Sequence, residues 1–83
     1  MKKIRLFVKP FCGWCHEAKD WLDERGIDYE ELDVISSRAA FQEMKNISGQ
    51  TLAPVIEVDG EVLADFDTAQ LEKFWKQFET EKK

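Results

Sequence analysis

Cysteine and histidine are scarce in this sequence, and their scarcity limits the metal sites and disulfides that the chain can form. The 83 residues include two cysteines and one histidine, and Cys12, Cys15 and His16 all fall within five residues. A structural zinc site needs four ligands, so these three would need carboxylates or a second chain to complete one. A disulfide between the two cysteines would also stabilise the fold little, because it would close a very small loop that hardly constrains the unfolded chain.

Long apolar runs and basic stripes are also missing. No apolar run approaches the roughly 20 residues of a membrane-spanning helix, so no membrane partner is expected. The net charge is −5, and the absence of a basic stripe argues against nucleic acid as a partner. The first apolar stretch is interrupted by Arg5 and stopped by Lys9 and Pro10, which is too short for a signal peptide. We therefore expect a cytoplasmic protein, in which disulfides are usually transient and catalytic.

The composition supports one compact domain. Hydrophobic residues make up 43% and aromatic residues 12% of the chain, which is ample for a packed core. There are no repeats, linkers or low-complexity segments, so residues 1–83 are expected to form a single domain, and a monomer is expected.

The first half of the chain predicts a strand, a helix and a second strand. Apolar residues alternate over residues 4–8, which is typical of a strand, and Pro10 helps to end it. From Cys12 the apolar period becomes helical, and Gly26 supplies a stop signal. Residues 27–35 indicate a second strand, which the right-handed crossover rule places parallel to the first.

The second half predicts a helix, a hairpin and a last helix. A serine at position 36 or 37 caps a helix, and Asp59-Gly60 between two apolar runs indicates a hairpin. Asp67 and Gln70 form a capping box at the start of the last helix. The order β-α-β-α-β-β-α predicts an α/β fold, a four-stranded mixed sheet with helices on both faces.

The segment KPFCGWCH contains the residues that are expected to react with a substrate. Cys12 stands where a strand passes into a helix, and the free N–H groups there favour a thiolate. Cys15 lies one turn into the helix and should be more buried. We therefore expect Cys12 to attack a disulfide and Cys15 to resolve the mixed disulfide. C-x-x-C-H also matches haem attachment, but that reading suits neither the preceding strand nor the cytosol. His16 is expected to face solvent.

The whole chain resembles the glutaredoxins, a branch of the thioredoxin fold. The resemblance rests on KPFCGWC after the first strand, SGQTLAPVIEV leading into the third, and DGEVLADFDTAQL leading into the last helix. It implies a cis peptide between Ala53 and Pro54 that faces the cysteines. It also implies that glutathione contacts Lys9, the Ala53 backbone and Asp67.

Other residues are expected to border the same site. Trp14, between the cysteines, should be partly exposed and able to stack on a substrate. Phe66 is a candidate to border the ligand, although it fits a core position equally well. The sequence departs from the family pattern in three places. Gly13 replaces the usual proline, Leu52-Ala53 replaces threonine-valine, and Ala64-Asp65 replaces a glycine pair. Asp65 adds bulk and negative charge, which is expected to weaken binding of an acidic tripeptide.

These residues predict a dithiol thiol–disulfide oxidoreductase. Its expected substrates are protein disulfides and glutathione mixed disulfides, with no bound cofactor and with glutathione as co-substrate. Two alternatives remain open at this point. One is an iron–sulfur cluster carrier that uses the first cysteine and glutathione. The other is a glutathione-independent redoxin that is reduced by thioredoxin reductase.

Overall fold

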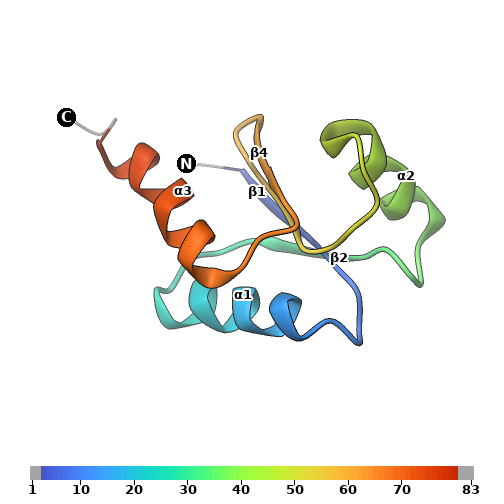
Figure 1. Ribbon diagram of the computed structural model, residues 1–83, viewed down its shortest axis with the longest axis horizontal. Helices are drawn as coiled ribbons and strands as arrows, with labels where there is room; N and C mark the ends of the chain where they lie inside the picture. The colour runs from blue at the N-terminus through green and yellow to red at the C-terminus, as the bar shows by residue number, and fades with distance from the viewer. Residues whose placement is uncertain (1–2, 81–83) are drawn as a thin grey trace.

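The computed structural model describes residues 3–80 and shows a mixed sheet with helices on both faces (Figure 1). Its strands run in the order β2-β1-β3-β4; β1 is parallel to β2 and antiparallel to β3, and β4 is antiparallel to β3. The predicted order of elements and the α/β fold are thus confirmed. The elements are β1 (Ile4–Val8), α1 (Gly13–Glu24), β2 (Glu30–Asp33), α2 (Arg38–Ser48), β3 (Val55–Val58), β4 (Glu61–Ala64) and α3 (Thr68–Thr80).

Strand β1 lies in the middle of the sheet, and its alternation decides which side chains meet which helices. Ile4, Leu6 and Val8 belong to the core cluster that contains the buried residues of α1 and α3. Phe7 points to the other face, where it packs with Ala40 and Met44 of α2. Side chains of a strand alternate between the two faces, so β1 contributes buried apolar residues to both faces, with the partly buried Arg5 on the Phe7 side.

Local signals mark the ends of the elements. Ser37 accepts a hydrogen bond from the Ala40 N–H and caps α2. Asp67 accepts a 2.9 Å bond from the Gln70 N–H, and the Gln70 amide oxygen accepts a 3.0 Å bond from the Asp67 N–H. This reciprocal pair is the predicted capping box, and it sets where α3 begins.

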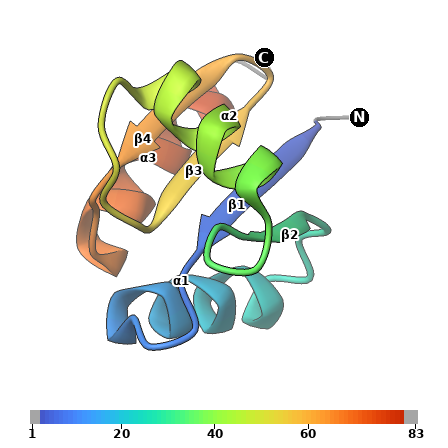
Figure 2. The same ribbon diagram turned by 90° about the vertical axis from the view of Figure 1, so that its right-hand side faces the viewer.

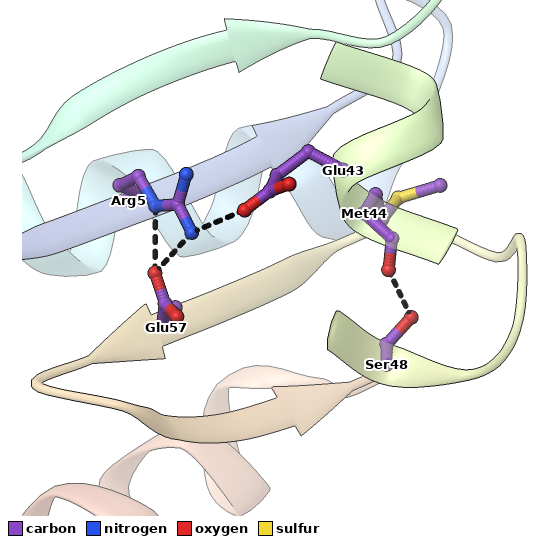
Figure 3. Close-up of polar contacts among 5 residues, drawn as sticks. All are labelled: Arg5, Glu43, Met44, Ser48 and Glu57. Atoms are coloured by element: carbon purple, nitrogen blue, oxygen red, sulfur yellow. Dashed lines mark hydrogen bonds and ion pairs between the residues drawn. The ribbon is translucent and has the colours of Figure 1, made fainter. Parts of the chain in front are cut away.

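A charged network joins α2 to the sheet (Figure 3). Arg5 of β1 donates from Nε to Glu57 of β3 at 2.6 Å and from its guanidinium to Glu43 of α2 at 3.0 Å. The side chains of Arg5 and Glu57 are each 19% exposed. In the same helix, the Ser48 hydroxyl donates a 2.6 Å bond to the Met44 carbonyl. The α2 face of the sheet therefore combines a small apolar cluster with ion pairs.

Candidate active site

Cys12 is the N-cap residue of α1. It has extended backbone angles, φ −97° and ψ 113°, and its sulfur accepts a 3.2 Å hydrogen bond from the Cys15 N–H. Its own N–H donates to the Lys9 carbonyl at 3.2 Å, and its carbonyl accepts from the His16 N–H at 3.2 Å. A sulfur in this position meets the free N–H groups and the positive end of a helix, which favours negative charge there.

Cys15 lies one turn further along α1 than Cys12 and is less accessible to solvent. Its side chain is 1% exposed and belongs to the core cluster of α1, α3 and the sheet, whereas Cys12 is partly exposed at the border of that cluster. Burial raises the pKa of the Cys15 thiol to about 12, and its hydrogen bond with Cys12 acts in the same direction. The two thiols are free and differ in access, with only Cys12 open to an incoming disulfide.

The loop before β3 faces Cys12. The Ala53-Pro54 peptide is cis, as the family resemblance implied. The Cys12 thiol makes a long contact of 3.8 Å to the Ala53 carbonyl, across 41 residues of sequence. Pro54 itself is buried, and its carbonyl accepts a 2.8 Å bond from the Asp65 N–H. The chain before β3 therefore reaches the sulfur, and the turn after β4 is bonded to Pro54. The loops before α1 and before β3 lie at the same end of the sheet (Figure 2).

Lys9 joins the two loops of the site. Its ammonium group donates a 3.2 Å hydrogen bond to the carbonyl of Thr51, two residues before Ala53. A positive charge is thus held beside the loop that faces Cys12. The position agrees with the expected role of Lys9, while its contact with glutathione stays a prediction.

Asp65 and Asp67 occupy the turn between β4 and α3. Asp65 is exposed and has a left-handed backbone with φ 52°, a conformation that aspartate adopts more readily than most residues. Asp67 is partly exposed and its carboxylate already caps α3. The Asp65 N–H donates to the Pro54 carbonyl and so continues the antiparallel pairing of β3 with β4 by one step, while contacts of the Asp65 and Asp67 side chains with a ligand stay predictions.

Phe66 does not border a ligand. Its side chain is fully buried and belongs to the same core cluster as Cys15. The expectation that Phe66 contacts a substrate is therefore wrong. Asp65 before it is exposed, while the Phe66 side chain packs in the cluster that also contains Leu71 of α3. Phe66 belongs to the core cluster against which Cys12 packs.

Two exposed apolar residues beside the site were missed in the sequence. Phe11 is 96% exposed directly before Cys12, and Leu52 is 54% exposed directly before Ala53. Trp14 is 47% exposed, which confirms the expected partial exposure. The available signal was adjacency to the cysteine motif and to the proline. Apolar residues next to reactive groups are candidates for substrate contact as well as for the core.

His16 is a surface residue. It is exposed, and its ring nitrogen Nε2 lies 3.1 Å from the Pro10 carbonyl, so the ring is directed to the loop before the motif. Within residues 3–80, no group of three or more histidine, cysteine or carboxylate side chains is arranged to hold a metal ion. In that same described part of the chain, no helix is long and apolar enough to cross a membrane.

A partly exposed cysteine capping a helix, a buried cysteine one turn on and a facing cis-proline define a thioredoxin-fold protein with a dithiol site. The glutaredoxin family model matches residues 4–63. The chain therefore belongs to the glutaredoxin family, and its general class is thiol–disulfide oxidoreductase.

Individual relatives agree with this assignment. The chain is 31% identical over 70 residues to a glutaredoxin-like 8.6 kDa protein in the rubredoxin operon of Clostridium pasteurianum, covering 84% of this chain and 93% of that protein. It is 31% identical over 67 residues to glutaredoxin 3 of Escherichia coli K12, covering 81% of each. The crystal structure of the thioredoxin-like protein BC3987 superposes with a TM-score of 0.79 at 31% identity, covering 86% of this chain and 97% of that one.

Proposed function

We propose that this protein reduces disulfides through a two-cysteine exchange in which Cys12 is the nucleophile and Cys15 the resolving thiol. The observation that carries the proposal is the asymmetry of the pair. The Cys12 sulfur caps the helix and accepts the Cys15 N–H at 3.2 Å, while the Cys15 side chain is 1% exposed. Attack requires an accessible thiolate, and only Cys12 combines access with a position that favours negative charge.

The exchange has two steps. The Cys12 thiolate attacks one sulfur of the substrate disulfide, and the other substrate sulfur leaves as a thiolate and takes up a proton. Cys15 then loses its proton and attacks the Cys12 sulfur, which releases the second substrate thiol. The substrate gains two electrons, and the protein is left with a Cys12–Cys15 disulfide.

Burial of Cys15 suits the second role. With its pKa raised to about 12, Cys15 stays protonated while Cys12 reacts. It becomes a nucleophile only when a base removes its proton beside the mixed disulfide. The leaving substrate thiolate is one such base, because it forms next to the site in the first step.

The proposed substrates are protein disulfides and glutathione mixed disulfides, with glutathione as co-substrate that restores the dithiol. Glutaredoxins as a family work with glutathione and protein disulfides. Lys9, held at the Thr51 carbonyl, supplies a positive charge for one carboxylate of the tripeptide. The Ala53 backbone and Asp67 are the other proposed contacts. A reducing compartment such as the cytoplasm suits this cycle.

Two variants test the assignment of the cysteines. Cys12→Ser is expected to lose measurable reduction of a protein disulfide. Cys15→Ser is expected to keep the first step and to accumulate a mixed disulfide at Cys12, visible as an added mass in intact-protein mass spectrometry. Turnover that persists in Cys12→Ser would contradict the assignment, and so would a mixed disulfide found at Cys15 in the parent protein.

The reductant is tested separately. The oxidised protein is mixed with glutathione, or with thioredoxin reductase and NADPH, and the return of free thiols is followed. Faster recovery with glutathione supports the proposal. Faster recovery with the reductase would show that thioredoxin reductase, and not glutathione, is the reductant. The proposed roles of Cys12 and Cys15 would be unaffected.

A further inference from the structure

The two outer strands of the described sheet, β2 and β4, differ in how their free edges are protected (Figure 2). Proteins commonly place charged side chains on an edge strand, because an open edge offers unpaired backbone groups to another strand. Strand β2 has the sequence EELD, and all its residues but the leucine are acidic. Strand β4 has the sequence EVLA, in which only Glu61 is charged. The β4 edge is therefore the one that can accept a further strand.

The backbone groups of Val62 and Ala64 point away from β3. In an antiparallel pair, successive residues direct their N–H and C=O groups alternately toward the partner strand and away from it. The Asp65 N–H donates to the Pro54 carbonyl at 2.8 Å, and the pairing of β3 with β4 continues from there without a break. The odd-numbered residues of β4 therefore bond to β3. Within residues 3–80, the N–H and C=O groups of Val62 and Ala64 have no hydrogen-bond partner.

A groove of about 410 Å³ lies between β4 and α3. It is lined by Leu63 of β4 and by Gln70, Lys73, Phe74 and Gln77 of α3. Leu63 and Phe74 are partly buried and pack against the core cluster of α1 and α3, so the base of the groove is apolar. Every second side chain of a strand added to β4 would lie on this face of the sheet, over the groove.

Two unpaired charges of opposite sign accompany the groove. Lys73 is the one charged residue among the described residues that line it, and its ammonium group makes no ion pair or hydrogen bond within residues 3–80. Glu61 is exposed at the hairpin end of β4, and in the same described range its carboxylate also makes none. Because α3 follows β4 through the short turn 65–67, Lys73 in the first half of α3 is expected nearer the Ala64 end of the strand.

A second copy of the chain fits this edge poorly. Two antiparallel β4 strands use all the free backbone groups of Val62 and Ala64 only when their pairing is centred on Leu63. That register sets Glu61 of each copy opposite Asp65 of the other. Like charges directly opposite one another in a sheet are destabilising, so the edge favours a different partner that is basic where it meets Glu61.

We propose that the β4 edge and the groove bind an extended segment of a partner protein as an added strand, antiparallel to β4. An apolar side chain of this segment lies opposite Leu63 and contacts Phe74. A basic side chain two residues later lies opposite Glu61, and an acidic side chain two residues earlier reaches Lys73. In such strand addition, main-chain hydrogen bonds provide affinity and the alternate side chains provide specificity.

The first experiment uses short capped peptides without cysteine, which cannot react with Cys12. The probe contains the run Glu-Val-Leu-Val-Lys and is titrated into ¹⁵N-labelled protein, with saturable amide shifts expected in β4 and along the groove. Replacing its leucine by serine should weaken binding about tenfold. Exchanging its glutamate and lysine should weaken binding about fivefold. Equal affinity for all peptides, shifts centred on β2, or no saturable binding at millimolar peptide would overturn the proposal.

N-methylation tests whether the peptide binds as a strand. With its leucine opposite Leu63, the two valines direct their N–H groups to Val62 and Ala64, while the leucine N–H points away from β4. A methyl group on either valine nitrogen should weaken binding about tenfold or more, because it removes a hydrogen bond and keeps the strands apart. The same group on the leucine nitrogen should change the affinity by less than about twofold. Equal effects at both positions would contradict strand addition.

Charge reversal in the protein tests the groove. Lys73→Glu should weaken binding of the probe about fivefold. Lys76→Glu is the matched control, because Lys76 is exposed on the same helix and does not line the groove. The double variant Glu61→Lys with Lys73→Glu should prefer the peptide whose glutamate and lysine are exchanged. Equal losses in the two single lysine variants would overturn the assignment of Lys73.

This surface does not depend on the exchange at Cys12. None of the residues that line the groove belongs to the segment 9–15 that contains the two cysteines. Cys12→Ser is therefore expected to bind the probe with the affinity of the parent protein. Loss of binding in Cys12→Ser, or amide shifts centred on residues 9–15, would place the peptide at the cysteine site and overturn the proposal.

Discussion

The two faces of the sheet are covered in different ways, and only one of them carries the redox pair. The face under α1 and α3 has a large core cluster that includes Cys15, Phe66 and Phe78. Aromatic rings meet edge-on there: Trp21 with Trp75 at 5.8 Å between centroids, and Trp75 with Phe78 at 5.9 Å. Such contacts add to the stability that burial provides.

The face under α2 is smaller and partly charged. Its buried residues are Phe7, Val34, Ala40, Met44 and Val55, and it also carries the network of Arg5 with Glu43 and Glu57. Cys15 lies in the larger cluster, on the α1 and α3 face. The apolar surroundings there keep its thiol protonated.

Removing Phe66 should produce the largest effect. Phe66→Ala is expected to lower the free energy of unfolding by about 3–5 kcal/mol, because it leaves a cavity in the core cluster. The same cavity should admit water and reagent near Cys15, so iodoacetamide should label Cys15 in the reduced protein. Chemical denaturation and peptide mapping provide the two measurements. If Phe66→Ala fails to fold, Phe66→Leu should show both effects at smaller size. Unchanged labelling of Cys15 would show that Phe66 does not limit the access of reagents to this thiol.

Met44→Ala makes the matching change on the other face. Its expected cost is about 2–4 kcal/mol in unfolding free energy, since the side chain is fully buried in the smaller cluster. The labelling of Cys15 should stay as in the parent protein, because Met44 belongs to a different cluster. Increased labelling of Cys15 in this variant would show that the two faces are coupled and would break the comparison.

Loss of Arg5 should have an intermediate effect. Arg5→Met leaves Glu57 and Glu43 without their cation and should cost about 1–3 kcal/mol. Lys19→Met is the control, since it removes the ion pair of Lys19 with Glu31 at 3.1 Å, in which Glu31 is 45% exposed. That exposed pair should cost less than about 1 kcal/mol. Equal losses in thermal or chemical denaturation would show that the Arg5 network contributes no more than a surface pair.

The smallest expected effect is a dependence of stability on pH through Cys15. Burial raises its pKa from 9.0 to about 12 in the folded state. Above pH 9 the thiol therefore ionises in the unfolded chain and stays protonated in the folded one, so stability falls as pH rises towards 12. The loss should be about 1 kcal/mol at pH 10.

Cys15→Ala isolates this contribution. The variant lacks the titrating thiol, so the reduced parent protein should lose more stability between pH 8 and pH 10 than the variant does, as measured by denaturation under reducing conditions. Parallel pH curves for the two proteins would mean that Cys15 titrates with an ordinary pKa in the folded state.

Much of the fold could be predicted because its signals are local. The alternation in β1, the Ser37 cap and the Asp67–Gln70 capping box each depend on residues within a few positions of one another. Asp59-Gly60 likewise predicted the hairpin, and both residues have the positive φ values, 50° and 90°, that such a turn uses. The spacing of Cys12 and Cys15 predicted their asymmetry for the same reason, because one turn of helix separates them.

The surroundings of the sulfur depended on contacts that no local signal reports. Phe66 fits a ligand wall and a core position equally well in the sequence, and only the packing of α3 on the sheet shows that it is fully buried. Phe11 and Leu52 could equally have been core residues. They stand on the loops before α1 and before β3, which lie at the same end of the sheet (Figure 2), and both side chains are exposed.

The sequence by itself determined the order of the elements, their caps and the spacing of the cysteine pair along α1, because each rests on residues close together in the chain. Only the tertiary structure decided the distances and the burial around Cys12. The Ala53 carbonyl lies 3.8 Å from its sulfur across 41 residues of sequence, and Cys15 is buried in the core cluster that the sheet forms with α1 and α3. Such contacts form when apolar faces are buried against one another, so they depend on the whole core rather than on any one segment.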